Sequence, residues 1–334
     1  MAKRIVTIGG GTGQYTLLSG LVNYPEVELT AICPVSDSGG NTGDCLQKNL
    51  QPLLDHSGAL LPPGDIGKCL LALSPHPLQA RLVHRISGVA GLENYNAINA
   101  LLVVFWQFTG DFLKSIAAVS EILEIRGRVL PVSGERAQLV AELPSGEILQ
   151  SEDEIYSAVN CHGGQCLAAP IRELRLVPPA IKALPEVVVA LQNADLIVIG
   201  PGCMPSSLIP ILLVPGVKEA IKASAAKKVY LANVMAHRGE QADFKLSSFV
   251  REMEKYLVGR FDAVLANAER PADEVLARYQ EQDQAKLVEI DVPADWDGRQ
   301  VVSAPLLLAS NSSKFKEYAR HDAGKLAAAV VKLI

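Results

Sequence analysis

The chain has 334 residues, of which 49% are hydrophobic and 20% charged, enough for one large domain or two smaller ones with a substantial core. Its net charge of −5 and its lack of a basic tract argue against electrostatic binding of nucleic acid. No apolar run reaches 18 residues, and none follows Lys3-Arg4 as a signal peptide would require, so we expect a cytoplasmic protein without membrane insertion.

The first predicted elements form a phosphate-binding turn. An apolar run from Ile5 to Ile8 predicts a buried strand, and a glycine-rich turn then leads into a helix-compatible stretch. This arrangement points free backbone N–H groups at an anion, and glycine lets a phosphate approach the backbone. Gln14 stands where strict G-x-G-x-x-G spacing needs glycine, and no Gly-Lys-Ser/Thr of a P-loop follows. A nucleotide or phosphate site is favoured over a simple tight turn. The predicted ligand-binding residues here are Gly9, Gly10, Gly11, Thr12 and Gly13.

Apolar strand signals then recur along the chain with helical patterns between them. The predicted core strands are Arg4–Ile8, Leu29–Val35, Asp195–Ile199, Lys228–Ala232, Ala263–Ala266 and Leu287–Ile290. The predicted intervening helices include Leu184–Gln192, Val217–Ala223 and Leu246–Leu257. Nearly continuous apolar strands that alternate with helices are typical of a doubly wound, mostly parallel α/β sheet covered on both faces.

Two stretches break this alternation, and we interpret both as elaborations of one nucleotide-binding domain that spans residues 1–334. Residues 44–127 are predicted to be a helical elaboration, and residues 128–178 a small β-rich insertion. The predicted helices are Ile66–Leu73, Gln79–Ile86, Tyr95–Phe108 and Phe112–Ile125. The predicted short strands are Arg128–Val132, Gln138–Glu142, Glu147–Gln150 and Arg172–Val177. The acidic segment Ser151–Glu154 is expected to be a solvated loop.

Small and polar residues follow most of the predicted core strands. In a doubly wound sheet the carboxyl ends of the strands meet at one edge, where ligands bind. These residues are therefore further candidates for the site. They are Asp37, Gly39, Gly40, Gly200, Pro201, Gly202, Ser206, Ser207, Asn233, Gly239, Glu240 and Asn267.

Two acidic residues have more than one interpretation. Asp37 lies 24 residues after Gly13, near the position of an acid that meets a ribose in dinucleotide sites. It could instead hold Mg²⁺, act as a catalytic base, or serve as an N-cap or Asx-turn residue. Asp65 follows Pro62-Pro63-Gly64 and precedes an apolar helix, so it could cap that helix, take part in the site, or both.

Several motifs together resemble one known family, the gluconeogenesis factor family. This is the YvcK-like branch of the superfamily that contains 2-phospho-L-lactate transferase (CofD). The resemblance covers nearly the whole chain in order. The motifs that carry it include Gly9-Gly10-Gly11-Thr12-Gly13, Asp37-Ser38-Gly39-Gly40, Pro62-Pro63-Gly64-Asp65-Ile66, Thr109-Gly110-Asp111-Phe112, Gly200-Pro201-Gly202 and Arg320-His321-Asp322.

The resemblance implies a Rossmann-like, three-layer α/β/α fold and a bound UDP-sugar, notably UDP-N-acetylglucosamine. It also implies regulation of carbon metabolism, cell shape or envelope synthesis. Tyr279 and Arg320 fill the family's sugar-nucleotide positions, and Asn99 is retained from its Gly-His-Ser-x-Gly-Asn motif. The CofD branch implies an alternative, a transferase that moves a phospholactyl-type group from a nucleotide donor with Mg²⁺ bound by acidic residues. Asp37 would then be the catalytic and metal-binding residue. The sequence is also compatible with a homo-oligomer.

The chain departs from the YvcK-like pattern in three places, one of which is the Gly-His-Ser-x-Gly-Asn motif, where Asn99 alone is clearly retained. The segment from Ser36 to Leu46 lacks the family's basic residues, and the segment from Gly200 to Ser207 lacks its tyrosine. These departures predict a divergent member whose ligand could differ. A third hypothesis, an NAD(P) enzyme, is weaker because the G-x-G-x-x-G spacing fails.

Overall fold

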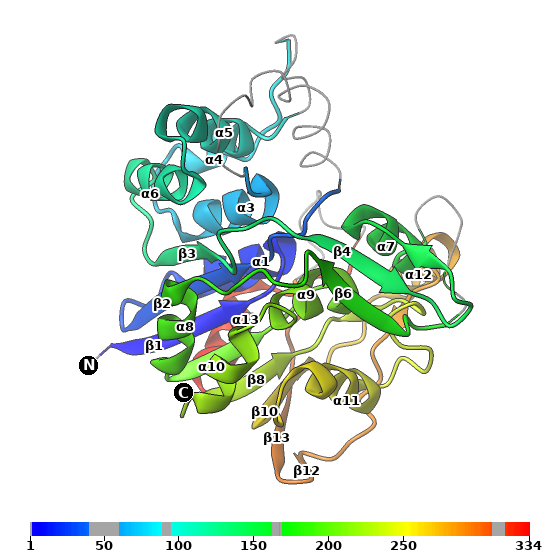
Figure 1. Ribbon diagram of the computed structural model, residues 1–334. Helices are drawn as coiled ribbons and strands as arrows, with labels where there is room; N and C mark the ends of the chain where they lie inside the picture. The colour runs from blue at the N-terminus through cyan, green and yellow to red at the C-terminus, as the bar shows by residue number, and fades with distance from the viewer. Residues whose placement is uncertain (1, 40–59, 89–94, 162–166, 168, 309–317) are drawn as a thin grey trace.

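The computed structural model describes residues 2–39, 60–88, 95–161, 167, 169–308 and 318–334. Its centre is an eight-stranded sheet whose neighbouring strands are parallel, except for one antiparallel pair at the edge formed by β12 and β13 (Figure 1). The mostly parallel α/β sheet predicted from the sequence is confirmed. In spatial order its strands are β12 (Asp295–Trp296), β13 (Arg299–Ala304), β10 (Ala263–Asn267), β8 (Lys227–Leu231), β7 (Leu196–Ile199), β1 (Lys3–Ile8), β2 (Val27–Cys33) and β3 (Arg128–Pro131).

The order of the strands reverses between β1 and β7. The chain proceeds from β1 to β2 in one direction and from β7 to β8 in the other. Right-handed crossovers in opposite directions place the connecting helices on opposite faces and leave a crevice at the reversal. In the register, Ile8 pairs with both Ile32 and Ile199, so these three strands end at the same level. A ligand crevice is therefore expected above Ile8.

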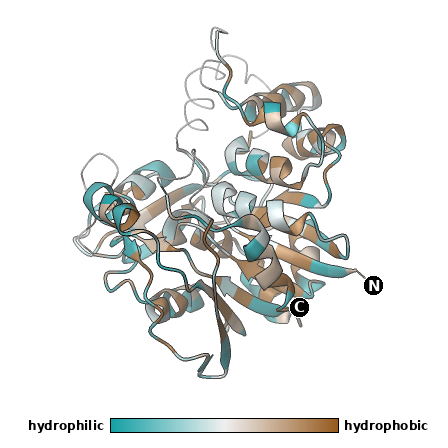
Figure 2. Cartoon of the chain, turned by 180° about the vertical axis from the view of Figure 1, so that it is seen from behind, coloured by the Kyte–Doolittle hydropathy of each residue, from teal (hydrophilic) through white to brown (hydrophobic). Residues whose placement is uncertain are grey.

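The helices form layers on both sides of the sheet. Helix α1 (Gly11–Leu21) packs between α3 (Pro63–Leu73) and α13 (Ala323–Val331). A Cβ on Gly20 would overlap the carbonyl oxygen of Ala323, so glycine allows α1 and α13 to touch. Hydrophobic residues gather in the central strands and the flanking helices (Figure 2). The helices of the other layer are α8 (Pro185–Gln192), α9 (Ile209–Leu212), α10 (Val217–Ala223) and α11 (Leu246–Tyr256).

The segment between β2 and β3 carries the predicted helices. They are α3, α4 (Gln79–Leu82), α5 (Ala97–Thr109) and α6 (Phe112–Ile122). The carboxylate of Asp111 accepts hydrogen bonds from the backbone of Leu113 and Lys114, which caps α6. Helix α4 is shorter than its prediction of Gln79–Ile86.

Within the described residues, no single helix is long and apolar enough to cross a bilayer. Two consecutive segments joined at a sharp bend, Met204–Leu212 and Val217–Ala223, reach the required length and apolar composition only when they are counted together.

A second, antiparallel sheet follows β3. Its order is β5 (Ile148–Leu149), β4 (Gln138–Glu142) and β6 (Glu173–Val177), as the turn and strand signals predicted. Strand β3 does not belong to it, because Arg128–Pro131 pairs with β2 in the main sheet. Between β5 and β6 the chain forms helix α7 (Glu152–Val159).

Two sequence predictions about secondary structure are wrong. Ser151–Glu154 is not a loop: the Ser151 hydroxyl accepts the Glu154 N–H and starts α7, and its acidic first turn suits the helix dipole. Leu287–Ile290 is not a core strand, because only β11 (Lys286–Leu287) forms there, paired with β9 (Met235–Ala236) outside the main sheet. Strand β13 occupies the place next to β10 instead.

Candidate functional site

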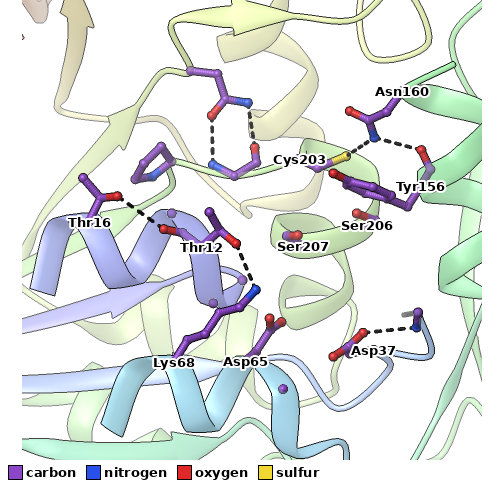
Figure 3. A pocket seen from close by; sticks show the side chains of 18 of the residues that line it. Thr12, Thr16, Asp37, Asp65, Lys68, Tyr156, Asn160, Cys203, Ser206 and Ser207 are labelled. Carbon is purple, nitrogen blue, oxygen red and sulfur yellow. Dashed lines mark hydrogen bonds between the residues drawn. The ribbon is translucent and has the colours of Figure 1, made fainter. Parts of the chain in front are cut away.

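A cavity of about 730 Å³ lies at the carboxyl ends of the strands around the reversal point (Figure 3). Its volume is within the range of small-molecule sites. Most of the residues predicted from the sequence line it, although they come from widely separated segments. Those that line it are Gly10, Gly11, Thr12, Gly13, Asp37, Gly39, Asp65, Asn99, Pro201, Gly202, Ser206, Ser207, Asn233, Glu240, Tyr279 and Arg320.

The first glycine loop is shaped by close packing inside the protein. Gly10 is the N-cap residue of α1, has an extended backbone, and supplies no side-chain cap to that helix. A Cβ on Gly13 would overlap the carbonyl oxygen of Pro201, and one on Gly11 would lie 2.8 Å from Cα of Asp65. Glycine is therefore needed at both positions before any ligand is considered, which the phosphate argument alone did not anticipate.

Gln14 replaces the third glycine of the dinucleotide fingerprint and has a structural role. Its buried amide donates 2.8 Å hydrogen bonds to the carbonyl oxygens of Gly9 and Ile32, which end β1 and β2. The hydroxyl of Thr7 donates to its side-chain oxygen. The side chain thus fixes the loop to the ends of two neighbouring strands.

A second loop, after β7, is held by two polar side chains. The amide of Asn233 donates to the carbonyl oxygen of Gly202 and accepts its N–H, both at 2.9 Å. Buried Glu240 accepts the N–H of Met204 at 2.9 Å, where the helical turn η4 (Met204–Leu208) begins. Burial raises the pKa of the Glu240 carboxyl. Both side chains line the cavity, and they also hold the backbone of the loop after β7 in place.

The amino end of α1 already contacts a carboxylate. The backbone N–H of Gly11 donates to Asp65, which lies in the first turn of α3. Burial raises the pKa of Asp65, while the positive charge of Lys68 and this hydrogen bond oppose the rise. The ammonium of Lys68 lies 2.9 Å from the hydroxyl of Thr12. Asp65 thus lines the cavity and is not the cap of its own helix, because the N-cap of α3 is Pro62 and no side-chain cap forms there.

A third acidic residue, Glu152 of α7, joins Asp37 and Asp65. The Ser38 N–H lies 3.5 Å from its carboxylate, and the Gly39 N–H donates to Asp37 in an Asx turn. Burial, followed by the negative charges of Asp37 and Asp65, raises the pKa of Glu152 to about 8. Within the described residues, no group of three or more His, Cys, Asp or Glu side chains is placed to hold a metal ion.

Tyr279 and Arg320 lie at the same cavity as the glycine loops. Tyr279 belongs to α12 (Asp273–Gln282), and its ring meets that of Tyr318 edge-on at 6.2 Å. The guanidinium of Arg320 lies 5.3 Å from the Tyr318 ring centroid. Burial raises the pKa of Tyr279 and lowers that of the neighbouring His321 to about 4.

Four predicted residues do not line the cavity. Gly9 and Gly200 lie beneath its loops. Gly239 packs against α7, where a Cβ would lie 2.9 Å from Cα of Val159. Asn267 accepts the N–H of Leu306 at 3.1 Å and so joins the end of β10 to the segment after β13. Gly40 lies outside the described residues.

Sequence reasoning missed several lining residues. Lys68 is one helical turn after Asp65, and His321 is next to Arg320, so periodicity and adjacency could have indicated both. Glu152 was missed because the segment that contains it was predicted to be a solvated loop, away from any strand end. The other missed polar residues are Thr16, Arg85, Asn96, Asp153, Tyr156, Ser157, Asn160, Cys203 and His237.

Comparison with known proteins identifies the family. Residues 5–307 match the family described as 2-phospho-L-lactate transferase CofD. The chain belongs to the CofD family. This CofD-family chain is 37% identical to a putative gluconeogenesis factor of Thermotoga maritima, over 99% of each chain. It is 33% identical to a gluconeogenesis factor of Bacillus subtilis, over 99% of this chain and 98% of the relative.

A solved structure has the same fold as this CofD-family chain. It is a crystal structure of a UPF0052 family member from Bacillus halodurans, 35% identical, with a TM-score of 0.83 over 99% of each chain. The resemblance to gluconeogenesis factors inferred from the sequence motifs is therefore confirmed, and so is the fold class.

Proposed function

We propose that this protein binds a UDP-sugar, such as UDP-N-acetylglucosamine, in the cavity above β1 and β7. One observation carries the proposal: Tyr279 and Arg320, far from the glycine loops in sequence, line the cavity that those loops form. A bound sugar nucleotide would report metabolic state, which suits a regulator of carbon metabolism, cell shape or envelope synthesis. Full-length similarity to proteins named gluconeogenesis factors supports that class of role.

The cavity offers a distinct group for each part of such a ligand. The half-buried ring of Tyr279 presents a planar surface for a base or sugar. The exposed guanidinium of Arg320 can form two parallel hydrogen bonds with a diphosphate. The amino end of α1, with Thr12 in its first turn, favours negative charge beside the N–H of Gly11 that Asp65 already accepts.

The acidic residues limit where a diphosphate can lie. Asp65 already accepts the N–H of Gly11, and Asp37 adds negative charge nearby, whereas Glu152, whose pKa is raised to about 8, is largely protonated at neutral pH. A bare diphosphate would be repelled on this side. Proteins commonly bind Mg²⁺ through one or two carboxylates together with substrate phosphates. Asp37 and Asp65 therefore fit a Mg²⁺ ion that arrives with the nucleotide, and the ion would neutralise the phosphates.

The same acidic residues favour a second candidate function, a CofD-type transferase. Transfer of a phosphoryl-linked group needs chiefly positioning and neutralisation of charge, so the lack of an assigned nucleophile does not oppose it. In this case Asp37 and Asp65 would hold Mg²⁺, and Glu152 would hold or release a proton beside the phosphates. The two candidates differ in whether the bound nucleotide is consumed.

Calorimetry of the whole protein with UDP-N-acetylglucosamine, with and without Mg²⁺, tests the first proposal. Tyr279→Ala and Arg320→Ala should each weaken binding at least tenfold, about 1.4 kcal/mol. Arg270→Ala is the matched control, because Arg270 pairs with Asp273 at the surface and does not line the cavity. Absence of binding by the parent protein, or unchanged affinity in both cavity variants, would reject the proposal. Conversion of the nucleotide during the titration would favour the transferase.

A further inference from the structure

Asn99 is a buried amide without a partner. It lies in the first turn of α5, is 1% exposed and lines the cavity. Neither its side-chain oxygen nor its nitrogen has a hydrogen-bond partner among the described residues. A buried polar group left unsatisfied costs about 1–3 kcal/mol, so such a group in a cavity indicates a missing ligand. The amide faces α3, since a Cβ on Gly67 would lie 2.8 Å from its oxygen.

Two cationic residues, Lys68 and Arg85, lie on segments next to α5 and line the same cavity as Asn99. Lys68 follows Gly67 in α3 and lines the cavity beside Thr12. Arg85 is held at the start of α5 because its backbone forms an isolated antiparallel β-bridge with Asn96. The residues on either side of Arg85 form backbone hydrogen bonds with the residues on either side of Asn96. Arg85 also lines the cavity, is exposed, and makes no ion pair with the described residues. Lys68 and Arg85 thus belong to two segments that contact the amino-terminal part of α5, and both line the cavity that Asn99 lines.

The amino end of α5 adds a favourable dipole. The helix has 13 residues, and no side chain caps its first turn. Its N-cap residue Asn96 and first-turn residue Asn99 line the cavity, so the positive end of the helix lies at the cavity. A helix amino end, a lysine, an arginine fork and an unpartnered amide donor together match the chemistry of a phosphate group.

We propose that Lys68, Arg85 and Asn99 form a second anion subsite, which binds the phosphate group of a ligand other than the UDP-sugar. Tyr279 and Arg320 come from α12 and the segment before α13, so the two subsites use different side chains of one cavity. The protein would then bind a phosphorylated small molecule alongside a nucleotide. The subsite does not depend on the UDP-sugar proposal, because Tyr279 and Arg320, which carry that proposal, take no part in it.

Calorimetry with inorganic phosphate at low ionic strength tests the subsite. The parent protein should bind phosphate with a Kd of about 1 mM or tighter. Lys68→Gln and Arg85→Gln should each weaken binding at least tenfold, and Asn99→Asp, which places a negative charge there, should abolish it. Arg81→Gln is the matched control, because Arg81 lies in α4 one turn before Arg85 and outside the cavity lining, so its affinity should change less than twofold.

A second titration, with UDP-N-acetylglucosamine at saturation, separates this proposal from the first. Phosphate should still bind, with the same dependence on Arg85. Because Arg85 is exposed, Arg85→Gln keeps the test decisive even if Asn99→Asp fails to fold. The second subsite would be overturned if the parent did not bind phosphate, if Lys68→Gln and Arg85→Gln bound phosphate as tightly as the parent, or if the nucleotide displaced phosphate. Failure of the nucleotide to bind would reject only the first proposal.

Discussion

Replacement of Gln14 by alanine should destabilise the protein more than its single amide suggests. The change removes two 2.8 Å hydrogen bonds, to the carbonyl oxygens of Gly9 and Ile32, and the acceptor of the Thr7 hydroxyl. The oxygen of Ile32 keeps the N–H of Gly9 at 3.3 Å. The main loss therefore falls on Gly9 and Thr7. At about 1–3 kcal/mol for each of these two orphaned buried groups, we expect a loss of about 2–6 kcal/mol in unfolding free energy.

Urea unfolding followed by circular dichroism measures this loss. Asn23→Ala is a matched control from the other end of α1, because its exposed amide bonds the carbonyl oxygens of Ser19 and Gly20. That variant should lose less than about 1 kcal/mol. The reasoning fails if Gln14→Ala is no less stable than Asn23→Ala. Gln14→Ala should also weaken nucleotide binding, since the glycine loop would lose its attachment to β2.

Two further predictions concern the walls of the cavity. The pKa of Glu152 is raised from 4.5 to about 8, so the folded state binds this proton more tightly than the unfolded state, and stability should fall as pH rises from about 4.5 to 8. Urea titrations at pH 5, 7 and 9 should show a smaller decline in Glu152→Gln, and equal declines would contradict the environment described for Glu152. Gly13→Ala should destabilise the protein by about 2 kcal/mol or more, because its Cβ would overlap the oxygen of Pro201. Gly134→Ala, whose Cβ would meet only Leu184 at 3.4 Å, should cost much less, and equal midpoints would refute the close contact.

The sequence predicted the elements with strong local signals. The apolar strands at Ile5–Ile8 and Leu196–Ile199, and the glycine loops that follow them, were evident because burial on both faces requires continuous apolar runs. Strand β13 was missed because its residues alternate between exposed and buried, which weakens that signal. Because β13 was not predicted, Leu287–Ile290 was assigned to the sheet in its place.

The site was only partly predictable for a different reason. Residues such as Asp37 and Ser206 follow strands, so topology alone brings them to one edge. Glu152 and Arg85 reach the cavity from helical and β-rich segments whose placement depends on tertiary packing. Tyr279 and Arg320 were assigned only through family resemblance, since nothing in their local sequence indicates that they approach the glycine loops.

The contact between α1 and α13 has a consequence for synthesis of the chain. The cavity takes its first wall from residues 10–16 and another from residues 319–321, which come just before α13. A nascent chain on the ribosome can form β1, α1 and β2 early, yet it cannot complete the cavity until α13 has emerged and packed against Gly20. Ligand binding would therefore begin only after nearly the whole chain has been made, and a protein truncated before α13 would present an open, incomplete site.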